Sequence, residues 1–172
     1  MTTGEGGMLV TADPVIAARA RTMRLHGIDR DVFNRFTDPR ASWVYDVVAP
    51  GFKYNLTDIA SALGLVQLQR ANYFVRIRAE RVARYDISFA DLPLILPPRP
   101  ADGDGHSWHL YIVQLTEDAP IDRDDFILAL KAQSIGTSVH YRPLHHMMVW
   151  KPFCEGAAFP RADLVFSRCV SL

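Results

Sequence analysis

Four histidines and a cysteine in the second half of the chain are the side chains that could bind a metal ion. They are His106, His109, His145, His146 and Cys154. Imidazole nitrogens and thiolate sulfurs are common zinc ligands, and many zinc sites show a Cys-x-x-Cys or His-x-x-x-His pair in the sequence. This chain contains neither pair. The sequence therefore predicts no metal site.

The segment 50–59 gathers aromatic, basic and polar side chains at the expected start of a helix. It begins with Pro50-Gly51, which favours a turn. Asn55 stands where a helix N-cap is expected, and Asp58 three residues later completes a capping-box-like pair. From the residues alone, Asn55 is interpreted as a helix cap.

Apolar residues after Asn55 recur mostly three, four or seven residues apart, which is the period of a helix. They are Ile59, Leu63, Val66, Tyr73, Ile77, Val82 and Tyr85. One long helix is therefore predicted over about 56–85. Upstream of it, Asp13-Pro14 is a favourable helix start, so a helix is predicted over 15–25. A short strand is predicted at 8–11 and an ordered loop at 28–49.

Four prolines and two Asp-Gly pairs around residues 97–107 predict a boundary between two parts of the chain. The residues after this boundary are rich in β-forming side chains at 109–115 and again at 137–141. Between these two predicted strands lies an amphipathic helix at 126–132. We therefore expect a β-α-β unit, which places the chain in the α/β class. A further helix is predicted at 162–168.

Composition narrows the classes of function. The 172 residues carry 19 basic and 19 acidic side chains, so the net charge is zero and no basic stripe is present. Nucleic acid and membrane surfaces are therefore not expected as partners. Two cysteines cannot build a disulfide framework, and no apolar segment is long enough to cross a membrane. With no secretion signal at the start, a cytoplasmic protein is expected.

Several short motifs, taken in their order along the chain, resemble the DegT/DnrJ/EryC1/StrS sugar aminotransferases. They are Thr3-Gly4-Glu5-Gly6-Gly7 with the apolar residues after it, Arg24-Leu25-His26-Gly27, Gly51-Phe52-Lys53-Tyr54-Asn55, Ala62-Leu63-Gly64, Ser107-Trp108-His109-Leu110-Tyr111 and Ile135 to His145. Each motif alone is weak, but their order and spacing extend over nearly the whole chain. Within the family, the segment 48–56 looks most like the aminotransferases that make UDP-4-amino-4-deoxy-L-arabinose.

The resemblance implies a fold and a reaction. The family consists of pyridoxal-phosphate enzymes of fold type I that transfer an amino group, usually from glutamate, to a keto-sugar nucleotide, and they act as homodimers. Residues 1–96 would then form the end of a large domain that includes the long helix. Residues 97–107 would be a linker, and residues 108–172 a small C-terminal α/β subdomain.

The resemblance also implies roles for individual residues. Asn55 would reach across a dimer to the cofactor phosphate, since a side-chain amide can donate to a phosphate oxygen, and Tyr54 would lie beside it at the cofactor. His145 would face the cofactor and the substrate sugar, and Arg142 would contact a nucleotide phosphate through its guanidinium. His140 is included with them in the substrate loop. For these three loop residues the alternatives are histidines hydrogen-bonded to the backbone and a surface salt bridge.

The lysine that forms the Schiff base with the cofactor would lie upstream of Met1 in this resemblance, so no catalytic residue is assigned within the chain. Lys53 falls in the turn that serves a neighbouring subunit and is interpreted as a surface or phosphate-facing lysine. The isolated chain is therefore expected to be an inactive portion of the enzyme. The alternative is a non-catalytic module, derived from the enzyme, that dimerises or binds sugar nucleotides.

Overall fold

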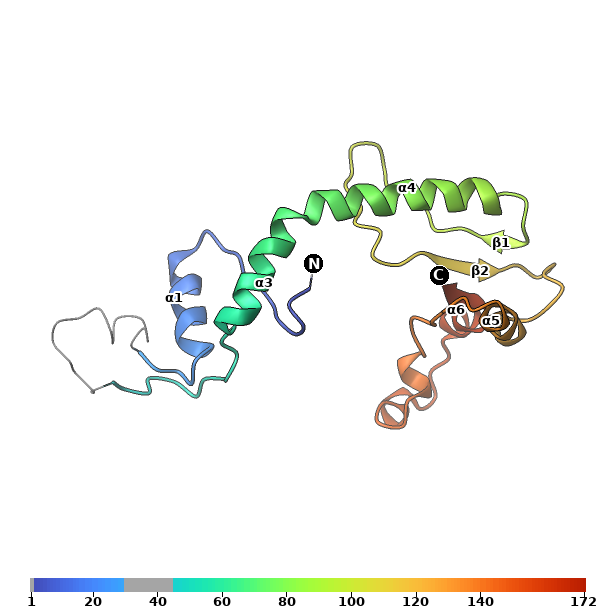
Figure 1. The fold of residues 1–172 in the computed structure, drawn as a ribbon. Helices are drawn as coiled ribbons and strands as arrows, with labels where there is room; N and C mark the ends of the chain where they lie inside the picture. Colours follow the sequence, from blue (N-terminus) through green and yellow to red (C-terminus); the bar gives the residue numbers. More distant parts are fainter. Residues whose placement is uncertain (1, 30–44) are drawn as a thin grey trace. The chain divides into compact units, whose positions relative to one another are not determined.

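The structure is a computed structural model that describes residues 2–29 and 45–172, and it divides into two compact units. Unit 1 comprises Met1–Ala71 and unit 2 comprises Asn72–Leu172. The described helices and strands are α1 (Pro14–Met23), α3 (Asp58–Gln69), α4 (Ala71–Phe89), β1 (Leu94–Ile95), β2 (Ile112–Leu115), α5 (Arg123–Ala132), the 3₁₀ helices η1 (Leu144–His146) and η2 (Lys151–Cys154), α6 (Pro160–Arg168) and β3 (Cys169–Ser171) (Figure 1). No helix within the described ranges has the length and apolar character of a membrane span.

Helix α1 confirms the predicted helix after Asp13. The Asp13 carboxylate accepts hydrogen bonds from the backbone N–H groups of Val15 and Ile16, and Pro14 occupies the first turn. The strand predicted at 8–11 is wrong, since residues 8–10 are exposed and pair with no strand among the described residues. A strand needs a neighbour for its backbone groups, and the sequence of one segment does not show whether a neighbour is available. The loop predicted at 28–49 lies mostly outside the described residues.

The single long helix predicted at 56–85 is wrong, because the structure has two consecutive helices, α3 and α4. They are separated at Arg70, whose backbone N–H is shared between the carbonyls of Val66 and Gln67. Asn55 is not the N-cap of α3. Thr57 caps it, and its hydroxyl accepts from the N–H of Ala60 at 3.3 Å. Because Asp58 is the first helical residue, Asn55 lies two positions before the cap and its side chain is not used there.

Unit 2 contains a three-stranded antiparallel sheet in the order β1-β2-β3. Its central strand, β2, confirms the second half of the strand predicted at 109–115. The second predicted strand is wrong. Residues 137–141 contribute only one bridge, Ser138 to Ser171, and the strands that pair with β2 are β1 and β3. In place of the predicted β-α-β unit, the structure has strand β2, helix α5 and, much later in the chain, the antiparallel strand β3.

The buried core of unit 2 lies where this sheet meets α4. Val113 and Val170 are opposite each other in the ladder between β2 and β3, and both are fully buried. Val82 of α4 packs in the same cluster with Trp108 and Tyr111. The helices predicted at 126–132 and 162–168 are confirmed within α5 and α6. The boundary predicted at 97–107 stays a prediction. The two compact units meet at residues 71 and 72.

Tyr111 links the core to a charged pair at its edge. Its hydroxyl donates to Asp86 at 2.6 Å, and Asp86 also pairs with Arg99. Burial and the bond to Asp86 raise the pKa of Tyr111 well above its ordinary value of 10.0. The folded state therefore keeps the Tyr111 proton at a pH where the unfolded chain has lost it.

Replacing Tyr111 by phenylalanine should lower the free energy of unfolding of unit 2 by about 1.5–3 kcal/mol at neutral pH, the usual contribution of a hydrogen bond to a charged group. The pH dependence gives a second readout. The stabilisation by Tyr111 is fully present below pH 10 and is lost as the pH rises through the higher pKa of the folded state. Urea unfolding should thus show a steeper alkaline loss of stability for the wild type than for Tyr111→Phe. Parallel pH profiles for the two proteins would contradict this role.

Candidate functional site

The segment 51–55 in unit 1 is held against the end of α1 by backbone hydrogen bonds. The N–H of His26 donates to the carbonyl of Phe52 at 2.8 Å, and the N–H of Phe52 donates to Met23 at 2.7 Å. A third bond runs from the N–H of Tyr54 to the carbonyl of Arg24, also at 2.8 Å. We call the segment 51–55 the aromatic turn. Its conformation is fixed by the backbone, so its side chains are available for other contacts.

Two glycines allow the two backbones to approach so closely. A Cβ atom on Gly27 would lie 1.8 Å from the carbonyl oxygen of Ala49, and Gly27 also has φ of +71°. A Cβ atom on Gly51 would lie 2.0 Å from the backbone nitrogen of Gly27. No side chain fits in either place. Gly27 and Gly51 therefore allow one contact between two motifs that are far apart in sequence. The motifs are Arg24-Leu25-His26-Gly27 and Gly51-Phe52-Lys53-Tyr54-Asn55.

Most side chains of the aromatic turn are exposed. The rings of Phe52 and Tyr54 are stacked with centroids 4.9 Å apart, and both rings are exposed. Lys53 is exposed and Asn55 is half-buried. No other described residue forms a hydrogen bond with the Asn55 side chain. The turn thus presents an unused amide, a cation and an aromatic surface together.

The predicted substrate loop in unit 2 is tied to β3 at one end. The Nδ1 atom of His140 lies 2.7 Å from the hydroxyl oxygen of Ser171, and the bridge between Ser138 and Ser171 fixes the adjacent backbone. The peptide between His140 and Tyr141 is cis. Arg142 is exposed. The alternative salt bridge for Arg142 is not formed with any described residue.

The other end of this loop is tied to α6. The Nε2 atoms of His145 and His146 lie 2.7 and 2.8 Å from the same carboxylate oxygen, Oδ1 of Asp163. The bond from His145 holds the pKa of the Asp163 carboxyl below its usual range. His145 also stacks on Phe159 with centroids 4.8 Å apart. His145 and His146 thus share a partner, Asp163, that the sequence analysis missed.

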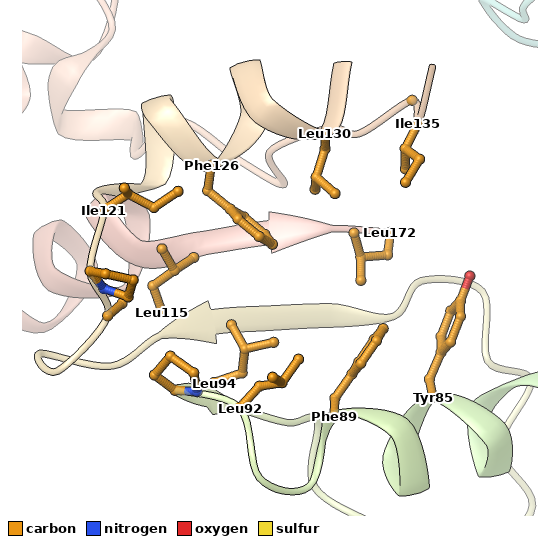
Figure 2. Close-up of a pocket in the computed structure, with 14 residues that line it drawn as sticks. Tyr85, Phe89, Leu92, Leu94, Leu115, Ile121, Phe126, Leu130, Ile135 and Leu172 are labelled. Atoms are coloured by element: carbon orange, nitrogen blue, oxygen red, sulfur yellow. The ribbon is translucent and has the colours of Figure 1, made fainter. Parts of the chain in front are cut away.

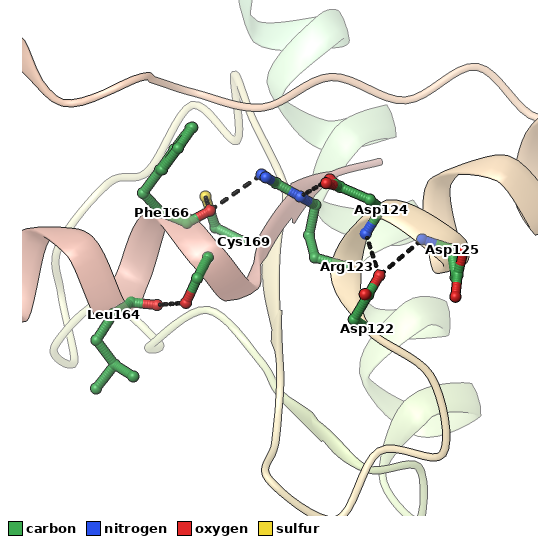
Figure 3. A network of polar contacts seen from close by, with 8 residues as sticks. Asp122, Arg123, Asp124, Asp125, Leu164, Phe166 and Cys169 are labelled. Carbon is green, nitrogen blue, oxygen red and sulfur yellow. Dashed lines mark hydrogen bonds and ion pairs between the residues drawn. The ribbon is translucent and has the colours of Figure 1, made fainter. Parts of the chain in front are cut away.

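Arg123 fixes the helix that carries Asp163. Its Nη1 atom donates to the carbonyl of Phe166 at 3.0 Å, near the end of α6, and its guanidinium lies over the Phe166 ring (Figure 3). At the start of α5, the Asp122 carboxylate accepts from the N–H groups of Asp124 and Asp125 at 2.9 Å each (Figure 3). Asp122 is therefore the N-cap of α5, and the adjacent Arg123 joins α5 to α6.

A cavity of about 540 Å³ in unit 2 does not suit a sugar nucleotide. It lies beside the sheet, with α5 on one side and the end of α4 on the other (Figure 2). Its lining is almost entirely apolar, and the labelled side chains that point into it include Phe89, Leu115, Phe126 and Leu172 (Figure 2). A sugar and a diphosphate require several polar partners. The polar candidates therefore lie elsewhere, on the aromatic turn and on the loop 140–146.

The structure accordingly brings the predicted site residues together in two sets. Tyr54 and Asn55 share the aromatic turn of unit 1, and His140, Arg142 and His145 share one loop of unit 2. The residues that sequence reasoning missed are Ser171 and Asp163. A Pro-initiated helix with an acid in its first turn is the only local signal for Asp163, and it does not name a partner.

Comparison with known proteins identifies the relatives of this chain. It is 40% identical to the spore coat polysaccharide biosynthesis protein SpsC of Bacillus subtilis over its whole length, which is 45% of SpsC. Among solved structures, the sugar aminotransferase CalS13 from Micromonospora echinospora is 28% identical with a TM-score of 0.77, and 99% of this chain covers 43% of CalS13. Spr1654 from Streptococcus pneumoniae, solved in a PLP-form, is 31% identical with a TM-score of 0.75. That match covers 94% of this chain and 40% of Spr1654.

These matches confirm the predicted α/β fold class, since the mixed helices and strands correspond to part of pyridoxal-phosphate-dependent sugar aminotransferases. The chain spans less than half the length of the relatives it matches. Pyridoxal phosphate is the cofactor of the family. The family match extends over residues 1–172. The chain therefore belongs to the DegT/DnrJ/EryC1/StrS aminotransferase family.

Proposed function

We propose that the protein containing these residues transfers an amino group from glutamate to a keto-sugar nucleotide, acting as a homodimer in the cytoplasm. The observation that carries this proposal is the family match over the whole chain, together with the structural likeness to sugar aminotransferases. The chain contributes two sets of binding residues to this function. The two sets lie in separate units of the described structure.

The aromatic turn suits the phosphate end of pyridoxal phosphate. A phosphate oxygen accepts hydrogen bonds, and the Asn55 amide has a free donor on a backbone fixed by three hydrogen bonds. The exposed Lys53 adds positive charge beside it. The exposed Tyr54 ring, stacked on Phe52, provides a flat surface at the same place. We assign the phosphate to Asn55 in the site of a neighbouring subunit, with Tyr54 next to it.

The loop 140–146 suits the substrate. Arg142 is exposed and has a guanidinium that can bind two oxygens of a nucleotide phosphate at once. His145 is oriented by Asp163 and Phe159, and His140 is oriented by Ser171. A sugar is recognised by hydrogen bonds to its hydroxyl groups, and oriented imidazoles can supply them. The substrate assignment is therefore Arg142 to phosphate, with His145 and His140 at the sugar.

The cofactor, when bound, carries the amino group from the donor to the acceptor. Its Schiff-base lysine is not assigned to Lys53, Lys131 or Lys151. Lys53 belongs to the aromatic turn, Lys131 to the end of α5 and Lys151 to η2, and all three are exposed. The residues of this chain thus bind and orient the reactants. The lysine that forms the Schiff base is a residue other than these three.

A chimaera tests the proposed function. Residues 1–172 would replace the matching segment of CalS13, which supplies the remaining length, with unaltered CalS13 as the control. We expect the chimaera to convert glutamate to 2-oxoglutarate only when a keto-sugar nucleotide is present, and mass spectrometry should show an amino group in place of the keto oxygen. A folded chimaera that binds pyridoxal phosphate without turnover of any keto-sugar nucleotide would refute the proposal. Binding of sugar nucleotide without turnover would instead support the non-catalytic module.

A further inference from the structure

We propose that His145, His146 and Asp163 form a binding site for one zinc ion. This inference goes beyond the proposed function, which places His145 at the substrate sugar, and its test measures metal binding by unit 2 without sugar nucleotide or pyridoxal phosphate. The three residues each offer one ligand atom, and these atoms all lie within 4.8 Å of one another. The expectation of no metal site rests on spacing within the sequence, which does not report a cluster formed by η1 and α6.

The geometry requires little rearrangement. Both imidazoles direct Nε2 at the same oxygen of Asp163, at 2.7 and 2.8 Å. Tetrahedral zinc holds nitrogen and oxygen ligands at about 2.0–2.2 Å, so two ligand atoms on one ion lie roughly 3.3 Å apart. Lengthening each of these two nitrogen–oxygen distances by about half an ångström would bring it to the separation of zinc ligands, and all three ligand atoms already lie within 4.8 Å of one another.

The surrounding side chains hold these ligands in place. His145 stacks on Phe159 at 4.8 Å, and His146 meets the edge of Phe166 at 5.9 Å. Phe166 is itself covered by the guanidinium of Arg123, which also binds the Phe166 carbonyl. Ring packing of this kind restricts the orientation of both imidazoles. The cluster is thus a supported arrangement and not a chance approach of three mobile side chains.

The chemistry of the donors favours zinc. Two imidazole nitrogens and one carboxylate oxygen match the three-ligand sites that bind zinc and leave a fourth position open. Magnesium and calcium prefer sites made only of oxygen atoms. The side chains of Asp163 and His146 are 44% and 36% exposed, so an ion and a water molecule can reach the cluster. Bound zinc would fasten η1, and with it the loop 140–146, to α6.

Calorimetric titration of the 172-residue chain with zinc tests this inference, using protein purified without a histidine tag. We expect one zinc ion per chain. Asp163→Asn and His146→Gln keep the size of the side chain and should each weaken binding at least about tenfold. The matched controls are Asp102→Asn and His109→Gln, which change exposed residues outside the cluster and should leave the affinity unchanged. Circular dichroism of each variant confirms that it is folded.

Cobalt provides a readout that does not depend on affinity. Replacing zinc by Co²⁺ should give the visible absorption of a tetrahedral ion, and Asp163→Asn should change or abolish that spectrum. Imidazole NMR signals of His145 and His146 should shift on addition of zinc, while those of His109 should not. Absence of one-to-one binding by the wild type, or equal binding by the Asp163→Asn/His146→Gln double variant, would overturn the proposal and leave the cluster as an ion pair.

Discussion

Replacing Gly27 by alanine should open the contact between α1 and the aromatic turn, with a loss of about 3 kcal/mol or more in local stability. Two costs add together. An alanine at φ of +71° is strained by about 1–2 kcal/mol. Its Cβ would also lie 1.8 Å from the carbonyl oxygen of Ala49, which is backbone and cannot rotate away. Hydrogen exchange at the N–H groups of His26, Phe52 and Tyr54 measures the effect, because each of them donates across this contact.

Other glycines of the chain separate the two costs. Gly103 has φ of +90° and open space within 4 Å of the place its Cβ atom would take, so Gly103→Ala should show the conformational strain alone. Gly105 has open space and no such φ, and Gly105→Ala should be neutral or slightly stabilising, by up to about 1 kcal/mol. Gly51→Ala should show the clash without the strain of a positive φ, since its Cβ atom would meet the backbone of His26 and Gly27. Unchanged exchange rates at His26 and Phe52 in Gly27→Ala would contradict the close contact.

Features determined by a few consecutive residues are predictable from the sequence. Asp13 and Asp122 cap their helices because a carboxylate two or three residues before an N–H can reach it whatever the rest of the chain does. The sequence pattern places the N-cap of α3 two residues too early, at Asn55. Both Asn55 and Thr57 are good capping residues, and only the position of the first helical residue, Asp58, decides between them.

Features that join distant segments are not predictable in this way. On one side β2 pairs with β3, more than fifty residues along the chain, whereas the β-forming residues at 137–141 lie nearer in sequence and are favoured by pattern alone. Asp163 lies 18 residues from His145, and no period or motif connects them. The motifs that resemble a family locate the aromatic turn and the loop 140–146, but the partners that orient their side chains come only from the structure.

Replacing Asn55 by alanine should weaken cofactor binding roughly ten- to a hundredfold in the CalS13 chimaera. The loss of one hydrogen bond to a charged phosphate corresponds to about 1.5–3 kcal/mol. Stability should change by less than about 0.5 kcal/mol, because Thr57 caps α3 and the Asn55 side chain bonds to no other described residue. Thr57→Ala is the matched control. It should reduce stability by about 1 kcal/mol and leave cofactor affinity unchanged. Equal affinities for the wild type and Asn55→Ala would remove Asn55 from the site.

Mixed dimers decide whose site Asn55 serves. One subunit lacks the Schiff-base lysine of the CalS13 portion, and the other carries Asn55→Ala. If Asn55 binds the phosphate in the neighbouring subunit, both defects fall on one site, the other site is intact, and activity returns on mixing. If Asn55 serves its own subunit, each site carries one defect and activity stays low. Because the backbone bonds from α1 hold the aromatic turn in either arrangement, the result reports the position of the cofactor rather than the folding of the turn. Low activity in well-formed mixed dimers would reject the role in trans.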